Sequence, residues 1–410
     1  MKIKKIFVTS IMLVLFFVNS TPIFASNTSE PNLDAKAAIL IDNKTKKVLY
    51  TKNENQKMYP ASTTKILTAI IAIENCNMSD IVTADYDEIM SIPEGYATAD
   101  IQIGEQLTVE QLLQLLLIHS ANDAANILAK YVGGSVDSFV SIMNTKANEL
   151  GLSNSHFTNA YGKHDENHYS SASDLATIFE YCLQNDTFRK IAGSASCSIP
   201  ITNKHDARAY DTTNELIIPG NSNYYRYVTV GKTGYTSQAG GCLVSAAYKE
   251  DLELISVILG SNDRFLDTQN LYKYGYNNYS IKNIANENDI ATQIEIKNGS
   301  RETKNLDLLV NENISALVKN SENNEEISPE IILKDSISAP IEEGSVLGKI
   351  TYTINGVKYT TDLIASHSVE KSDFYTLYIP IVVIASLFLV SCIIVVLYKL
   401  NISKKSKFEI

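Results

Sequence analysis

The sequence contains no tryptophan, little cysteine and no excess of positive charge. Its formal net charge is −11 at pH 7, and no lysine-rich stripe or RNA-binding motif occurs, which argues against nucleic acid as a partner. Five cysteines are spread over 410 residues without a CxxC pair, so no zinc site is indicated. We expect buried thiols outside the C-terminal apolar run, and one disulfide of undetermined pairing stays possible. The length allows two domains.

Two apolar runs lie near the ends of the chain. The run at residues 6–18 follows a basic start and precedes a plausible cleavage site at residues 23–26, which predicts a signal peptide over residues 1–26. An uncleaved anchor is the alternative, and either segment would export the rest of the chain. No lipobox cysteine follows the first run, so a lipoprotein is not expected.

The second run predicts a transmembrane helix over residues 377–398, preceded by a polar linker at residues 366–376. Roughly 20 apolar residues at about 1.5 Å per residue suffice to cross a bilayer. Four lysines lie in the tail at residues 399–410, which predicts a cytoplasmic C-terminus and a single-pass protein of the cell membrane with its main part outside. A buried core helix is the alternative.

Between the two apolar runs, the predicted secondary structure changes near residue 281. Residues 27–280 mix helical periods with strands, including a hairpin at residues 37–50 and strands at residues 227–236, 242–248 and 252–259. Residues 281–365 carry short alternating strands and the strong hairpin signal Asn355-Gly356. We expect an α/β (α+β) domain with helices around an antiparallel sheet, followed by a small all-β domain.

A serine and a lysine share one face at the start of a predicted helix. Ser62 precedes apolar residues at helical spacing, and Lys65 follows at i+3, with about 5–6 Å between the Cβ atoms. A serine hydroxyl needs a base to become a nucleophile, and a lysine desolvated in a cleft can supply one. The spacing alone is weak, because Ser368 and Lys371 repeat it in a polar stretch.

Two further motifs are placed to present side chains into a cleft. Ser120 and Asn122 lie on a short turn between an apolar helix that begins at a capping box (residues 108–111) and a second helix at residues 124–131. Ordinary helix capping is the alternative. Lys232-Thr233-Gly234 lies on a strand, where a glycine lets a ligand or another backbone approach closely.

His164 and His168 raise the question of a metal site. They lie four residues apart, but their surroundings contain glycine and asparagine and lack the HExxH order, so the segment is expected to be a loop. We therefore expect neither a metal nor an organic cofactor. A helix over residues 174–183, capped by Ser173, should follow this loop.

The three motifs occur in the order Ser-x-x-Lys, Ser-x-Asn, Lys-Thr-Gly, and with them the chain resembles the penicillin-binding serine D-alanyl-D-alanine carboxypeptidases of low molecular mass. The resemblance covers nearly everything after residue 35 and implies a β-lactamase/transpeptidase-like fold. It also implies that Ser62 attacks the bond between two terminal D-alanines of a peptidoglycan pentapeptide. Lys65 would be the base, and Ser120, positioned by Asn122, would pass a proton to the leaving D-alanine.

The remaining implied roles concern binding of the substrate. Lys232 and Thr233 would hold its carboxylate beside Gly234, and the backbone N–H groups of Ser62 and Tyr235 would form the oxyanion hole. β-Lactams resemble the D-Ala-D-Ala group, so they should acylate Ser62 and hydrolyse slowly. The chain departs from many relatives at residues 229–231 and at Tyr235, and it lacks the second arginine that some relatives carry near Leu266.

Three rival functions share parts of this pattern. A class A β-lactamase would lack the β domain and the C-terminal span, and Glu166 lacks the surrounding sequence of a deacylating glutamate. A transpeptidase or D,D-endopeptidase would use the same residues with a different acceptor. A β-lactam or peptidoglycan sensor would need a cytoplasmic signalling domain, and only a short tail follows the span.

Overall fold

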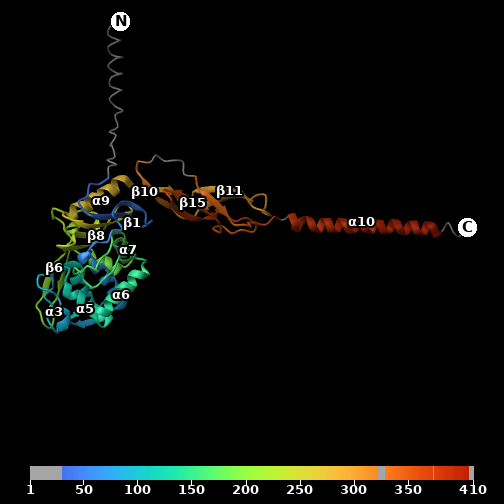
Figure 1. The fold of residues 1–410 in the computed structure, drawn as a ribbon. Coiled ribbons are helices and arrows are strands. Elements are labelled where there is room, and N and C mark those ends of the chain that lie inside the picture. Colours follow the sequence, from blue (N-terminus) through green and yellow to red (C-terminus); the bar gives the residue numbers. More distant parts are fainter. Residues whose placement is uncertain (1–29, 322–327, 373, 406–410) are drawn as a thin grey trace, which may run out of the picture. The chain divides into compact units, whose positions relative to one another are not determined.

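The computed structural model describes residues 30–321, 328–372 and 374–405. The predicted signal peptide lies outside these residues. The described part of the chain forms two compact units (Figure 1). Within the described residues, the larger unit comprises residues 30–281 with 319–321, and the smaller one residues 282–318, 328–372 and 374–405.

A five-stranded antiparallel sheet forms the centre of the larger unit, with the strand order β2-β1-β9-β8-β7. The hairpin and the three later strands predicted from the sequence are therefore present, and β7 is an edge strand. The strands are β1 (Ala37–Asp42), β2 (Val48–Lys52), β7 (Val228–Thr236), β8 (Gly240–Lys249) and β9 (Leu252–Ser261).

Buried side chains alternate between the two faces of this sheet, as expected when both faces are covered. Ile39 and Ile255 belong to the main core with the helices that carry the catalytic motifs. Their neighbours Leu40 and Leu254 lie against Gly275 of α9 (Arg264–Asn278) on the other face, where a Cβ on the glycine would come within 2.5 Å of Leu254. Figure 1 shows α9 across the sheet from α5 and α6.

The helices of the main core follow the predicted order with two corrections. The helix expected from residue 124 starts at Asn122, and the one expected to be capped by Ser173 starts at Ala172, because the Ser171 side chain accepts the Asp174 N–H. The helices are α2 (Lys65–Asn75), α3 (Tyr86–Met90), α4 (Val109–Gln114), α5 (Asn122–Gly133), α6 (Val136–Glu149), α7 (Ala172–Leu183) and α8 (Asp186–Ala192).

Short elements complete the larger unit. The Thr108–Gln111 capping box is present, and α4 continues into a π-turn at Leu115–His119. Two small hairpins lie at the periphery: β3 (Ile81–Thr83) with β4 (Gln106–Thr108), and β5 (Ser196–Ile199) with β6 (Arg208–Asp211).

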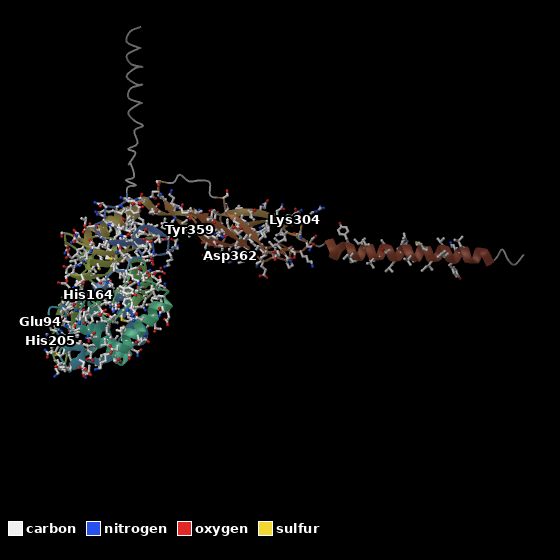
Figure 2. All side chains as sticks on the ribbon, viewed as in Figure 1. Glu94, His164, His205, Lys304, Tyr359 and Asp362 are labelled. Carbon is white, nitrogen blue, oxygen red and sulfur yellow. The ribbon has the colours of Figure 1, made fainter. Side chains whose placement is uncertain are left out.

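The smaller unit is all-β in its folded part, as predicted. Asn355 and Gly356 both have positive φ, 52° and 79°, which is the two-residue turn that their sequence favours. The Tyr359 hydroxyl accepts the Leu317 N–H at 3.0 Å (Figure 2). The strands are β10 (Tyr279–Ala285), β11 (Ile290–Glu295), β12 (Asn305–Val310), β13 (Ile314–Lys319), β14 (Glu330–Leu333), β15 (Val346–Ile354) and β16 (Val357–Ala365).

A single long helix, α10 (Phe374–Lys405), ends the described chain. Its segment Tyr378–Leu400 spans 23 residues, is strongly apolar with a mean hydropathy of 3.1, and is not buried by any described residue. This segment is long and apolar enough to cross a membrane.

Candidate active site

Ser62 lies on a tight turn that leads directly into α2. The turn is a 3₁₀ segment, Ala61–Thr64, and α2 begins at Lys65. The edge strand β7 packs against it, since a Cβ added to Gly234 would lie 2.9 Å from the Ser62 backbone nitrogen. The sequence-based expectation of a close backbone approach at Gly234 is therefore met, and the other partner is the turn that carries Ser62.

The Lys65 side chain is fully buried and makes three polar contacts. Its Nζ lies 2.9 Å from Ser62 Oγ, 2.6 Å from Asn122 Oδ1 and 2.9 Å from the Tyr161 carbonyl oxygen. Burial lowers the pKa of Lys65 well below its ordinary value, and the nearby Lys232 lowers it further, against the opposing effect of Asp123. The site therefore favours a neutral amine at Lys65.

The three contacts of Lys65 fit a neutral amine that acts on Ser62. A neutral amine has two N–H donors and one lone pair. The amide oxygen of Asn122 and the carbonyl of Tyr161 only accept, so they take both donors. The lone pair is left for the Ser62 hydroxyl, which is the only one of the three partners with a proton to give.

Ser120 is held in an unusual backbone conformation at the end of the π-turn. Its φ is 68°, in the left-handed region that non-glycine residues rarely adopt. The next helix, α5, begins at Asn122, and the buried Asp123 carboxylate accepts the backbone N–H groups of Ala99 and Ile101. The turn is thus fixed from both sides, so Ser120 and Asn122 have little freedom to move.

Lys232 joins the second and third motifs. Its buried Nζ donates to Ser120 Oγ at 2.9 Å and to the Thr233 carbonyl at 3.1 Å. Burial, with a contribution from Arg264, lowers the pKa of Lys232 to about 7. Thr233 Oγ1 lies 2.5 Å from Thr213 Oγ1. Tyr235 follows on the same strand with 67% of its side chain exposed.

Three residues that the sequence did not single out complete the site. Tyr161 contributes a backbone carbonyl to Lys65, Thr213 pairs with Thr233, and Arg264 Nη1 donates to the Gly234 carbonyl at 3.2 Å. Arg264 is the one that a sequence signal could have found, because it is the only arginine in the segment after β9 where the second cation of some relatives lies.

The two loop histidines have separate surroundings. His168 is buried, its Nδ1 accepts the Thr158 N–H, and its Nε2 therefore carries the proton donated to Thr64 Oγ1 at 2.9 Å. Burial lowers its pKa to about 4, so it is a neutral link between the loop and the turn at Ala61–Thr64. His164 instead packs edge-on against Tyr59. Among the described residues, no three His, Cys, Asp or Glu side chains are grouped to hold a metal.

Comparison with known proteins places this cleft in a family. Residues 25–263 match the family model described as D-alanyl-D-alanine carboxypeptidase, and residues 279–371 match that of the penicillin-binding protein 5 C-terminal domain. The Bacillus subtilis D-alanyl-D-alanine carboxypeptidase DacF is 33% identical over 359 residues, 85% of this chain and 89% of the relative. The Escherichia coli relative DacC is 29% identical over 88% of this chain and 91% of its own length.

Solved structures give the same family. Penicillin-binding protein 5 of Haemophilus influenzae aligns with a TM-score of 0.64 and 25% identity, covering 84% of this chain and 99% of that one. The Streptomyces K15 DD-transpeptidase aligns with a TM-score of 0.57 and 30% identity over 60% of this chain and 99% of its own. The chain therefore belongs to the D-alanyl-D-alanine carboxypeptidase family of penicillin-binding proteins and is a serine-type D-Ala-D-Ala carboxypeptidase.

Proposed function

We propose that Ser62 is the nucleophile of this carboxypeptidase and Lys65 its general base. The supporting observation is the buried Lys65 amine, whose two acceptor-only partners leave its lone pair to the Ser62 hydroxyl. Ser62 Oγ attacks the carbonyl between the two D-alanines as its proton passes to Lys65. The C–N bond breaks, an ester forms on Ser62, and D-alanine leaves. Water then hydrolyses the ester and returns the shortened peptide.

Ser120, Lys232 and Thr233 would serve the leaving group and its carboxylate. Ser120 Oγ accepts a hydrogen bond from Lys232, so its own proton is free to pass to the departing amine. Lys232 would attract the substrate carboxylate, and the Thr233 hydroxyl would bind it. The N–H groups of Ser62 and Tyr235 would bind the oxyanion, where the loss of one donor typically costs about 10²–10³ in rate. β-Lactams would acylate Ser62 by the same steps.

The acceptor of the acyl group is tested by competition between water and an amine. One relative, from Streptomyces strain K15, is named a D-alanyl-D-alanine carboxypeptidase. A solved structure from the same strain is named a DD-transpeptidase, so both reactions have been assigned to proteins that resemble this chain. The full chain in detergent is incubated with acyl-D-Ala-D-Ala, with and without glycylglycine. We expect free D-alanine and hydrolysed peptide to dominate. A transfer product that exceeds hydrolysis at millimolar amine would favour the transpeptidase.

We further propose that α10 anchors the enzyme in the cytoplasmic membrane, with the folded units outside and the tail inside. The length and apolar surface of Tyr378–Leu400 support this, together with the lysines that follow it. A chain that ends at residue 372 should move from the membrane fraction to the soluble fraction while keeping its penicillin labelling. Membrane retention of the shortened chain would require another anchor.

The lowered pKa values of Lys65 and Lys232 predict two limbs in the pH profile of kcat/KM, which reports on the free enzyme. Activity should fall as the pH rises above about 7, because Lys232 then loses the charge that attracts the carboxylate. It should also fall at low pH, where Lys65 becomes protonated. In Lys232→Arg the charge persists, so the alkaline limb should disappear. An unchanged alkaline limb in that variant would show that another group causes it.

A further inference from the structure

A cavity of about 510 Å³ lies next to the catalytic cleft in the larger unit. Its walls come from α3, α5, the turn between α5 and α6, and the loop at residues 158–165. Tyr161 belongs to this loop and lines the cavity, while its carbonyl accepts the Lys65 amine. A group bound in the cavity would therefore contact the loop that holds the general base.

The cavity continues the catalytic cleft along one face of α5. Asn126 lines it and lies one turn after Asn122, which binds Lys65, so the two asparagines are separated by about 6 Å along the helix. The lining extends along the same helix to Gly134. The cavity is therefore lined from about one helical turn beyond Asn122, which contacts Lys65.

Two buried polar atoms in this wall have no partner among the described residues. Asn126 is 3% exposed, and its amide nitrogen donates to the Glu88 carbonyl and to Ser91 Oγ, which fixes the direction of Oδ1. Neither Asn126 Oδ1 nor His164 Nδ1 has a hydrogen-bond partner among the residues that the structure describes (His164 is labelled in Figure 2). Buried polar atoms are rarely left unpaired, and the Asn126 amide oxygen can only accept, so it indicates a ligand that donates a hydrogen bond.

The charges around the cavity favour a cationic donor. The Lys130 ammonium is engaged by Glu88 at 2.6 Å and Asp85 at 2.8 Å. The carboxylates of Asp87 and Asp165 also line the cavity, against the single further cation Lys163 among its described lining residues. The lining thus combines an unpaired amide oxygen with a surplus of carboxylates, which suits an alkylammonium group.

We propose that this cavity binds the side-chain ammonium of the diamino acid that precedes D-Ala-D-Ala in the peptidoglycan stem, an inference that rests on the proposed function. That residue is attached directly to the D-alanine whose carbonyl Ser62 attacks. Its side chain therefore starts one residue upstream of the attacked carbonyl, and the cavity shares Tyr161 and α5 with the groups around Lys65. Recognition there would select stems by their third residue.

The test compares two peptides that differ in a single charge. The full chain in detergent is assayed with Nα-acetyl-Lys-D-Ala-D-Ala, which keeps the ε-ammonium, and with its Nα,Nε-diacetyl form. We expect kcat/KM to favour the charged peptide by about tenfold, the size of a hydrogen bond to a charged group. Asp165→Asn and Asn126→Leu should each reduce this ratio severalfold. Glu166→Gln, a charge change one position away and outside the lining, should leave the ratio unchanged.

The outcomes separate the two proposals. Release of D-alanine from both peptides at equal kcat/KM would overturn the ammonium site and leave the carboxypeptidase mechanism intact. If Asp165→Asn and Asn126→Leu both keep the full preference for the charged peptide, the ammonium binds outside this cavity. No release from either peptide would remove the proposed function, and this site with it. Asn126→Leu removes the hydrogen bonds to the Glu88 carbonyl and to Ser91 Oγ, so this variant could fold less well. Asp165 is exposed, so Asp165→Asn tests the site without that effect on folding.

Discussion

Replacing Ser62 with alanine is expected to abolish both D-alanine release and covalent labelling by penicillin. The hydroxyl that lies 2.9 Å from the Lys65 amine would be gone, and no acyl-enzyme could form. In another serine peptidase, loss of the nucleophile costs about 10⁶ in kcat, and a loss of roughly 10⁴ or more is expected here. D-Alanine release from acyl-D-Ala-D-Ala and intact-protein mass spectrometry after penicillin treatment would measure the two effects.

The chain supplies its own matched control for this experiment. Ser368 has the same spacing to a lysine as Ser62, but it lies in the smaller unit, where its hydroxyl accepts the Glu343 N–H. Ser368→Ala should therefore label and turn over as the unchanged protein does. A stable penicillin adduct on Ser62→Ala would show that another residue is the nucleophile.

Replacing Lys65 with methionine should slow acylation of Ser62 by about 10²–10⁴, the usual contribution of a general base. Methionine roughly keeps the volume of this fully buried side chain and removes the amine. The measurement is the second-order rate constant of penicillin acylation. Acylation at the unchanged rate would exclude Lys65 as the base, whatever happened to the later hydrolysis.

The same variant should alter the pH dependence of stability. Folding lowers the pKa of Lys65 below 10.5, so between the lowered pKa and 10.5 the unfolded chain binds more protons than the folded one. The free energy of unfolding therefore rises with pH across that window. Above pH 10.5 Lys65 is deprotonated in both states, so it causes no further rise. Urea unfolding at a series of pH values should show a smaller rise in Lys65→Met. An equal slope in both proteins would mean that Lys65 is not held neutral.

Local sequence patterns were sufficient to predict the fold class. Strands appear as β-branched runs, the Asn355-Gly356 turn requires two positive φ values, and the capping box at Thr108 starts its helix. Each of these signals depends on neighbours within a few residues, and the structure contains all three. The helix starts at Asn122 and Ala172 were displaced by two residues. For Ala172 the reason is that Ser171 caps the helix in place of Ser173, whereas the helix at Asn122 follows Ala121 without a side-chain cap.

The parts of the cleft that the sequence does not reveal depend on contacts between distant segments. Tyr161 acts through its backbone carbonyl, which every residue type possesses, so nothing in the sequence marks it. Thr213 matters only because its loop lies against β7, and the left-handed Ser120 follows from the π-turn before it. The three motifs indicated which side chains would meet, whereas the groups that hold them were visible only after folding.

The two buried lysines, Lys65 and Lys232, leave the site short of negative charge. Lys232 lowers the pKa of Lys65, and the pKa of Lys232 itself lies at about 7. A ligand carboxylate bound beside Lys232, as proposed, would supply the missing counter-charge and raise that pKa again. Binding above neutral pH would then draw a proton from the solution, so the measured heat of binding should vary with the ionisation enthalpy of the buffer. The cleft thus takes up substrate and proton together, and acidification of the surrounding medium would strengthen its hold on the peptide terminus.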